Sequence, residues 1–457
     1  MKLVLVGHAC WLVETADVRI LFDPLLFDPN QADCYEVHPS RKVSVEALRS
    51  VQIVVVSHRH IDHFDVRSLS SVSKRAYVLC PNDALVVDTL RSIGFRHVEA
   101  LQDWQSVRFG ETTLLATPSE NNVPEHGFVI SDSGCAIWNQ VDSQVSEHTA
   151  KRVSQSYDRL NVIICPWQPL MELKFQFNED TSFPHRSYFE LLTRARSCDA
   201  QLLVPGASGF RYSSRAEWLN RLAFPVTRDR FIQDLGDSLP NRGMCLQGMD
   251  PGDEIVCEFG SPVVLRQASH VVKSAAGEDH RISYCPVDPF ANLYTDAPNG
   301  DPQAGDIADP IKDLDRFIRS TSLDPYSPLN LLRAWKVVYQ LIVCFDDRNC
   351  FVNWDFGREI VRVDGLSARA TATSIISGRA LLALYRGECS WEEAYHSGEW
   401  RFFQTVAAVS ELQYSLPKPQ DIEDVLRMRY SYHTCFERLI SGEVERWRHS
   451  GAVSDSE

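Results

Sequence analysis

The sequence lacks the features that mark several common protein classes. Among its 457 residues, no apolar run approaches the roughly 20 residues that span a bilayer. The N-terminus has one basic residue and a short apolar run, too little for an export signal. The chain has 46 Lys plus Arg against 61 Asp plus Glu, which gives a net charge of −15. Its basic residues do not cluster into a block. We therefore expect neither a membrane nor a nucleic acid as partner.

Paired cysteines are missing as well. The 13 cysteines stand singly, with no Cys-x-x-Cys pair. This spacing argues against a structural zinc site and against a disulfide framework, and it is typical of reduced thiols. With the missing export signal, the cysteine pattern predicts a cytoplasmic protein.

Short aliphatic and β-branched runs, bounded by Gly, Pro, Asp or Ser, fill the first half of the chain. Helix-like patterns lie between several of them, at 45–49, 83–93 and 188–196. This alternation predicts an α/β layered fold. The expected strands are 2–6, 19–22, 53–56, 77–79, 113–116, 127–130, 136–138, 162–164 and 202–204.

We divide the chain into an α/β domain at 1–260, a connecting segment and linker at 261–310, and an α+β C-terminal domain at 311–450. Residues 296–310 are rich in turn formers and acid, which is typical of a linker. The C-terminal part is rich in aromatic residues, which suit an ordinary core, a substrate wall or a homodimer interface. Its expected helices are 311–320, 329–343, 374–384 and 420–448, with strands at 350–356 and 359–363.

The residues with clear chemical potential follow the strand 53–56. The sequence there reads Ser57-His58-Arg59-His60-Ile61-Asp62-His63-Phe64-Asp65. Open α/β sheets bind ligands beyond the carboxyl ends of their strands, so these imidazoles and carboxylates lie where a site is expected. His58 and His60 can face one position while Asp62 and His63 face a second. The motif therefore predicts two adjacent metal ions on one loop.

This HxHxDH motif resembles the metallo-β-lactamase superfamily. The stretch Gly7 to Glu14, followed by Ile20 to Pro24, is similar to the opening hairpin of its lactonase-like branch. The resemblance implies an αββα sandwich for residues 1 to about 260. It also implies that Asp23 orients a metal-binding histidine from beneath the loop. His8 is either a similar supporting residue or a plain strand-end residue.

The sequence departs from the hydrolases of that superfamily at two ligand positions. Where they have a histidine after a small-Pro strand end, this chain has Glu120 or Asn121. Their last histidine is also missing from 203–210. Asp142 matches the metal-bridging aspartate. Two histidines, His126 and His185, are candidates to fill the gap.

The resemblance thus implies His58, His60 and Glu120 at one metal, Asp62 and His63 at the other, and Asp142 between them. Asp62 and Asp142 are the expected catalytic carboxylates. Zinc hydrolases of this fold use imidazole-rich sets. A set with more carboxylates favours iron or manganese over zinc, so we expect two iron ions.

These departures are similar to features of two oxygenase branches of the superfamily. One is a diiron β-hydroxylase type, and the other is the CMP-N-acetylneuraminic acid hydroxylase type, which carries a Rieske domain. No Cys-x-His pattern of a Rieske domain occurs here, so an external reductase or ferredoxin would supply electrons. We predict an oxygenase acting on a small molecule. The alternatives are a lactonase- or phosphodiesterase-type metallohydrolase and a binding protein without turnover.

Overall fold

The structure is a computed structural model of the 457-residue chain. It describes residues 1–157, 159–169, 171–177, 179–238, 243–258, 260–275, 284, 304–321, 324–345, 348–357, 360–367, 369–406, 408–409, 414–418, 421–431, 440 and 444.

Two β-sheets form the N-terminal domain. The first has eight strands, in the spatial order β18 (Ser261–Leu265), β17 (Glu254–Glu258), β1 (Lys2–Gly7), β2 (Cys10–Glu14), β3 (Arg19–Phe22), β6 (Ile53–Val55), β7 (Tyr77–Pro81) and β8 (His97–Leu101). The second has seven, in the order β16 (Cys245–Leu246), β14 (Ala200–Pro205), β13 (Leu160–Cys165), β12 (Ala136–Asn139), β11 (His126–Ser131), β10 (Thr112–Pro118) and β9 (Ser106–Phe109).

The strand sequences explain why these sheets are covered on both sides. Side chains of a strand alternate between its two faces. In β1, Leu3 and Leu5 pack into the core between the sheets, while Val4 and Val6 pack into the core beneath the helices of the first sheet. Strands that are buried on both faces have continuous hydrophobic sequences. This is why the sequence predicts these strands.

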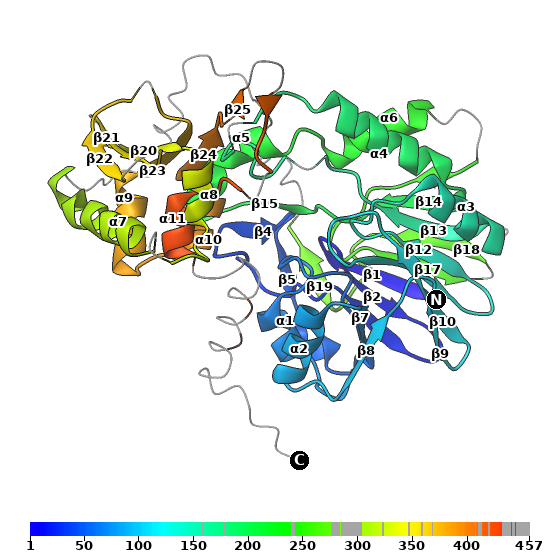
Figure 1. Cartoon of the computed structure of the whole chain (residues 1–457). Helices are drawn as coiled ribbons and strands as arrows, with labels where there is room; N and C mark the ends of the chain where they lie inside the picture. The colour runs from blue at the N-terminus through cyan, green and yellow to red at the C-terminus, as the bar shows by residue number, and fades with distance from the viewer. Residues whose placement is uncertain are drawn as a thin grey trace.

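Helices cover the two outer faces (Figure 1). The first sheet carries α1 (Val66–Ser71) and α2 (Ala84–Ser92). The second carries α3 (Glu147–Ser156), α4 (His185–Ser197) and α6 (Arg228–Ser238). The αββα sandwich predicted from the sequence is therefore confirmed.

Smaller elements complete the domain at the edge that carries the site. Two ribbons pair distant segments, β4 (Tyr35–Val37) with β15 (Phe210–Tyr212) and β5 (Arg41–Val43) with β19 (Val272–Ser274). Short helices are η1 (Val45–Leu48), η2 (Ser214–Leu219) and α5 (Asn220–Ala223).

The C-terminal domain is built around one mixed five-stranded sheet with its own core. The strand order is β22 (Val361–Asp364), β21 (Asn349–Asp355), β20 (Val338–Cys344), β23 (Ala372–Ser377) and β24 (Trp400–Gln404). Its helices are η4 (Ala304–Ile307), α7 (Ala308–Thr321), α8 (Leu329–Ala334), α9 (Gly378–Arg386), α10 (Trp391–His396) and α11 (Val425–Tyr430), with a further ribbon of β25 (Ala408–Val409) and β26 (Tyr414–Ser415).

Two predicted helices in this domain were partly wrong. The predicted helix at 329–343 ends at Ala334, and Val338–Cys344 is the central strand of the sheet, paired on both sides. The predicted helix at 374–384 begins only at Gly378, because the Ser377 side chain caps it there and the residues before it form β23. In both cases β-branched residues next to a helical pattern belong to a strand.

Other boundaries moved less. Residues 296–303 of the predicted linker lie outside the described residues, and α7 already begins at Ala308. Within the expected helix at 420–448, the structure has α11 at Val425–Tyr430. Most of residues 432–448 lie outside the described residues. The described helices include none that is long and apolar enough to cross a membrane.

Candidate metal centre

The histidine loop leaves the first sheet at the carboxyl end of β6. This strand runs parallel to β3, so the residues that follow the two strands emerge side by side. The loop makes a tight turn in which the backbone N–H groups of His63 and Phe64 both donate to His60 O, at 3.0 and 2.7 Å. Phe64 is buried in the core beneath α1 and anchors the loop. These contacts bring the imidazoles of His58 and His63 to a ring-centroid distance of 4.2 Å.

Asp23 holds the loop from beneath. It follows β3 with a positive φ of 40° and is fully buried. Its carboxylate accepts from Ser57 N and Ser57 Oγ, both at 2.7 Å, and lies 2.9 Å from His63 Nδ1. A carboxylate at Nδ1 fixes the tautomer of an imidazole and leaves Nε2 for a metal. Asp23 thus fixes both the backbone and the ring that the site needs.

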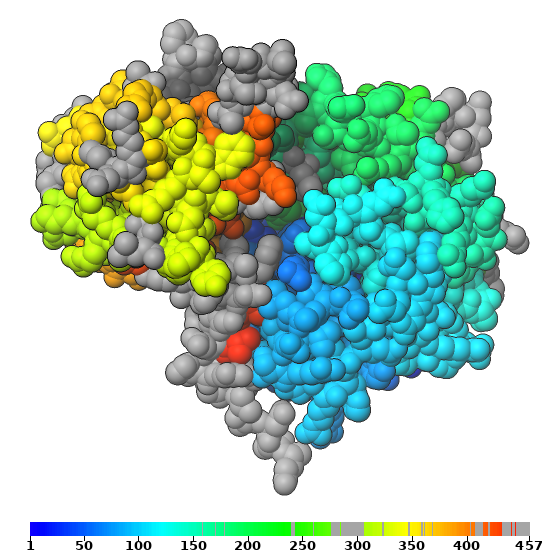
Figure 2. All heavy atoms as spheres, in the orientation of Figure 1, coloured from blue at the N-terminus to red at the C-terminus, as the bar shows by residue number. Residues whose placement is uncertain are grey.

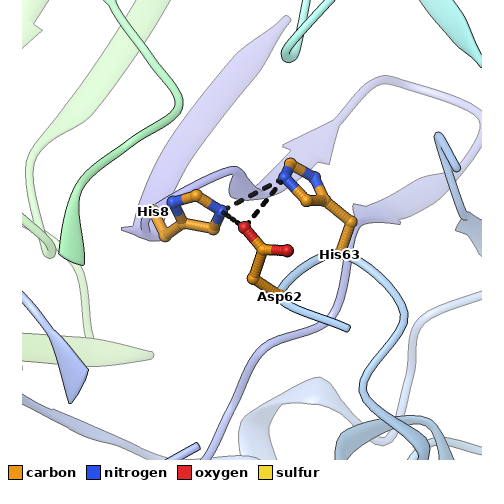
Figure 3. Close-up of side chains that lie close together, drawn as sticks. All are labelled: His8, Asp62 and His63. Carbon is orange, nitrogen blue, oxygen red and sulfur yellow. Dashed lines mark hydrogen bonds and ion pairs between the residues drawn. The ribbon is translucent and has the colours of Figure 1, made fainter. Parts of the chain in front are cut away.

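Three side chains converge in front of this support (Figure 3). His8 Nε2 lies 3.1 Å from Asp62 Oδ2 and 3.3 Å from His63 Nε2, and His63 Nε2 lies 3.4 Å from Asp62 Oδ2. These atoms come from two segments, the end of β1 and the motif loop. They could hold one metal ion together. His8 therefore faces the same point as the motif residues, rather than supporting them from behind.

The turn that presents His8 has a strict local requirement. Gly7 has φ of 137° and His8 has φ of 53°. Positive φ is disfavoured for residues with a Cβ, which makes glycine the natural residue at Gly7. A Cβ there would also overlap the side chains of Arg41 and Val37. His8 tolerates its own positive φ because its ring is fixed by the cluster.

A second group of ligand atoms adjoins the first through His63. Asp142 Oδ2 lies 3.0 Å from His63 Nε2, and the Asp142 Oδ1 atom is buried without a hydrogen-bond partner. His58, His63 and Asp142 could hold a metal ion together. His60 lies beside them, with its Nδ1 atom 2.9 Å from His58 Nε2. Since His63 belongs to both groups, the arrangement offers two neighbouring positions.

Glu125 is a residue of this site that the sequence analysis did not select. It is buried, and its Oε1 atom lies 3.4 Å from His58 Nδ1 without a hydrogen-bond partner. Ser119 Oγ and Asn121 Nδ2 donate to its other oxygen, Oε2. The sequence does carry one signal for Glu125. It stands directly before strand β11, in the segment where the resemblance leads us to expect a histidine.

The buried charges of the cluster stabilise and oppose one another. Burial alone would raise the pKa of Asp62, but His63 and His8 hold it well below its usual range. Asp62 and Asp142 in turn hold the pKa of His63 well above its usual range against burial. Burial and the nearby Asp142 carboxylate raise the pKa of Glu125 to about 7. Without a metal, Asp62 and Asp142 therefore favour the charged form of His63.

The remaining candidates from the sequence lie elsewhere. The Glu120 side chain is exposed. Asn121 acts through Glu125, as described above. His126 Nε2 lies 3.1 Å from Asp103 Oδ1, and His185 is exposed at the start of α4. Neither histidine joins the two groups of ligand atoms, and Glu120, His126 and His185 all remain predictions as ligands.

The motif loop is also fixed from outside. Arg59, between the first two histidines of the motif, forms a two-pronged ion pair with Asp83, with distances of 2.6 and 2.7 Å. Asp83 caps α2 by accepting from Leu85 N. Paired N–H···O bonds of this kind restrict direction as well as distance. The loop is thereby tied to the helical layer while its imidazoles face the opposite way.

The donor set fits metal ions. Buried carboxylates that face imidazoles and leave oxygen atoms unpaired are costly unless a cation or proton compensates them. Metal binding needs deprotonated ligands, so at His63 a metal ion would compete with the proton that Asp62 and Asp142 favour. The Asp142 Oδ1 atom, which is buried without a hydrogen-bond partner, is a free ligand position in one of the two groups.

The N-terminal part of the chain is similar to known proteins. Residues 2–144 match the family model described as a beta-lactamase superfamily domain. A putative Rieske 2Fe-2S iron-sulfur protein from Mycolicibacterium smegmatis is 30% identical over 156 residues, which cover 32% of this chain and 30% of that protein. A UPF0173 protein from Pyrococcus abyssi is 26% identical over 132 residues, 28% of this chain and 55% of that protein. The chain thus matches only part of the length of either relative.

Solved structures with similar folds include two kinds of enzyme. A diiron beta-hydroxylase from Streptomyces venezuelae is 14% identical with a TM-score of 0.39, covering 58% of this chain and 54% of that one. A possible metal-dependent hydrolase from Veillonella parvula is 16% identical with a TM-score of 0.40, covering 56% of this chain and 98% of that one.

Proposed function

Because residues 2–144 carry a beta-lactamase superfamily domain, we propose that this protein is a dinuclear metal-dependent oxygenase that oxidises a small molecule with O2. The observation that supports this choice is the share of carboxylates in the cluster, with Asp62 and Asp142 among the grouped ligand atoms and the buried Glu125 carboxylate beside His58. Oxygen-rich ligand sets favour iron or manganese over zinc. Iron is the proposed metal.

In this proposal His58 and His60 would hold one ion, and His8, Asp62 and His63 would hold the other, with Asp142, which lies in one group with His58 and His63, between them. Glu125 would support His58 from its Nδ1 side. Two ferrous ions in this position would supply electrons to dioxygen. The protein itself supplies the binding geometry and the electrostatic environment. A separate reductase or ferredoxin is part of the proposal, because the reaction consumes electrons.

The side chains around the ligands each have a defined task. Asp23 keeps His63 Nδ1 occupied, so that Nε2 faces the cluster. Ser57 Oγ lies 2.9 Å from His58 Nδ1 and does the same for that ring. Ser119 and Asn121 donate to Glu125 Oε2, so that Oε1 stays beside His58 Nδ1. Such supporting contacts typically change metal affinity or activity by about 10- to 100-fold when removed.

Metal content tests the proposal. Protein expressed with both iron and zinc available should contain about two irons per chain by inductively coupled plasma mass spectrometry. After anaerobic reduction, added oxygen should change the absorption spectrum. Two zinc ions per chain, with no spectral response to oxygen, would overturn the proposal.

A hydrolase is the second candidate, and one observation favours it. His8 Nε2 lies beside Asp62 and His63, so it adds an imidazole to the metal position that lacks the family's last histidine. An imidazole-rich zinc pair activates a bound water for attack on an ester or phosphoester. Hydrolysis of such substrates by the zinc-loaded protein, without oxygen consumption, would favour this candidate.

A further inference from the structure

The N-terminal domain contains a hollow that opens to the solvent. Its empty volume is about 390 Å³ when the solvent space at its mouth is included, which is enough for a small ligand. The lining comes from segments that are far apart in the sequence and includes Trp167, Gln168, Phe210, Val226, Thr227 and Arg228. The metal ligands proposed above are not part of this lining. The hollow is therefore a feature separate from the cluster itself.

One wall of the hollow also borders the metal centre. Phe210, the first residue of β15, lines the hollow, and its ring lies edge-on to the His8 ring with centroids 5.2 Å apart. Gly209 precedes it in the lining, and a Cβ at Gly209 would lie 3.4 Å from His8 Cα and His8 N. Figure 1 shows β15 beside β4 between the two domains, and Figure 2 shows a furrow in the surface where these domains meet. Only the segment with Phe210 thus separates the hollow from His8.

Trp167 brings an unsatisfied hydrogen-bond donor to the hollow. This residue is 5% exposed, and its Nε1 atom is buried without a hydrogen-bond partner. The next residue, Gln168, fixes the segment, because its side-chain amide donates to Val226 O at 2.8 Å and accepts from Val226 N at 3.2 Å. Buried polar atoms nearly always have a partner. An indole N–H only donates, so the missing partner of Trp167 is an acceptor.

The start of helix α6 contributes further donors to the same hollow. Thr227 and Arg228 line it, and α6 is 11 residues long. The first N–H groups of a helix have no partner within the helix. Thr227 Oγ1 accepts from Arg230 N at 3.2 Å. Within the part of the chain that the structure describes, Arg228 N and Asp229 N donate to no acceptor. The positive end of the helix dipole therefore adds to the indole N–H of Trp167.

The charges at the hollow are compatible with an anion. Arg228 donates to Met249 O and to Asp250 Oδ1, so the guanidinium and this carboxylate compensate each other. The Asp229 side chain is exposed, and the lining contains no Asp or Glu. Phe210 and Val226 supply apolar surface. The hollow thus combines hydrogen-bond donors with apolar walls.

We propose that this hollow binds the carboxylate group of the substrate, and that the substrate is a small acid with an apolar or aromatic body. This inference rests on the proposed function, because it names the substrate class of that metal centre. A carboxylate only accepts hydrogen bonds, as the indole N–H and the N–H groups at the start of α6 require, whereas an ammonium group only donates. The body of the acid would lie against Phe210, which separates the carboxylate from His8 and the metals.

Three probes of similar shape test the inference on the metal-loaded full chain by isothermal titration calorimetry. Benzoate carries the carboxylate, benzamide has a neutral acceptor in its place, and benzylamine has a cation. Hydrogen bonds to a charged acceptor are about twice as strong as neutral ones. Benzoate should therefore bind about tenfold more tightly than benzamide, and benzylamine should bind more weakly still. Benzylamine that bound as tightly as benzoate would overturn the inference.

A substitution at Trp167 locates the carboxylate. Trp167→Phe keeps an aromatic ring but removes the N–H, and it should weaken benzoate binding by about tenfold while metal content stays unchanged. Trp104→Phe is the matched control, because Trp104 is not part of the lining, and its affinity for benzoate should equal that of wild type. Benzoate that bound only to the metals would be indifferent to both variants, and this result would contradict the proposed position.

Two variants at the mouth of the hollow provide a test that leaves the buried residues untouched. Thr227 is exposed. Thr227→Phe places a large side chain in the mouth and should reduce the affinity for benzoate by at least about tenfold. Thr227→Ala loses the same contact with Arg230 N but leaves the mouth open, so it should retain the affinity. If benzoate bound equally well to wild type and to Thr227→Phe, the hollow would not be its site.

The inference and the proposed function fail in different ways. Zinc-loaded protein whose benzoate binding still depends on Trp167 would count against the oxygenase alone. Iron-loaded protein that responds to oxygen, but whose benzoate binding does not depend on Trp167, would count against the inference alone.

Discussion

Asp424 in the C-terminal domain and Glu125 in the N-terminal domain are both buried carboxyl groups, but their surroundings differ. Asp424 accepts from Tyr339 OH, Ser374 Oγ and Leu426 N at Oδ1, and from Trp400 Nε1 at Oδ2. Glu125 has donors on one oxygen only, and the other faces His58.

The difference separates a structural carboxylate from a functional one. Every acceptor of Asp424 is used to join a strand, a helix and two aromatic side chains within the C-terminal core. A fully satisfied buried network stabilises one conformation, and a half-satisfied one is unfavourable unless a ligand completes it. Variants of either group can test this distinction.

The largest effect should come from removing His63, whose Nε2 atom belongs to both groups of ligand atoms. We expect His63→Ala to lose at least one metal per chain and to reduce turnover by roughly 100-fold or more, because Nε2 of His63 faces Asp62 and Asp142 together. Metal analysis and oxygen consumption measure this. The folded C-terminal domain should be unaffected, and a variant that kept both metals would contradict the assigned cluster.

Removing the structural carboxylate should act on stability instead. Asp424→Ala leaves the Tyr339, Ser374 and Trp400 donors without their acceptor, and we expect a loss of about 3 to 5 kcal/mol in the free energy of unfolding. Urea denaturation measures it. Asp424→Asn, which keeps one acceptor, should lose less. A loss below about 1 kcal/mol would mean that these donors find other partners.

The next prediction compares the effects of Glu125 and Glu120 on metal binding. Glu125→Gln should weaken metal binding by about 10- to 100-fold, whereas Glu120→Gln should leave it unchanged, since that side chain is exposed. Competition with a chromophoric chelator gives both affinities. If the Glu120 variant lost metal and the Glu125 variant did not, Glu120 would be the ligand, as the resemblance in the sequence implies.

The smallest effect concerns the metal-free protein and pH. The folded-state pKa of Glu125 is raised to about 7 from an ordinary value of 4.5. The unfolded chain therefore releases this proton first, and the stability contributed by the protonated group is lost as pH rises from about 5 towards 7. Compared with wild type, metal-free Glu125→Gln should gain relative stability across this interval, by roughly 1 to 2 kcal/mol. Thermal unfolding at several pH values measures it, and parallel curves would contradict the raised pKa.

The sequence predicts the N-terminal fold well because its strands are buried on both faces. Runs such as 53–56 and 162–164 clearly predict strands, because continuous β-branched residues between turn formers are typical of a strand that is buried on both faces. In the C-terminal domain the runs adjoin helical patterns. Val338–Cys344 follows α8 after only three residues, and no periodicity marks the change from helix to strand.

For the site, the sequence identifies the residues that are close together in the chain. The motif loop and Asp142 follow strand ends, where α/β folds place ligands. The contact of Glu125 with His58 depends on long-range packing, so spacing alone could not select this residue. The sequence predicts Glu120, with Asn121 and His126 as alternatives, from the position of the family's histidine. In the structure Glu120 is exposed, and the buried glutamate is Glu125, which accepts hydrogen bonds from Ser119 and Asn121.

The pairing of β1 has a consequence for how the protein is made. Val4 pairs with Glu254, so the first strand finds one of its two neighbours only after about 250 further residues have been synthesised. At a ribosome speed of about 5 to 20 residues per second, this takes roughly 12 to 50 s. Until then the edge of β1 is open to chaperones or to pairing with another nascent chain. His8 follows that strand, so the candidate site stands on a strand that gains its second neighbour late in synthesis.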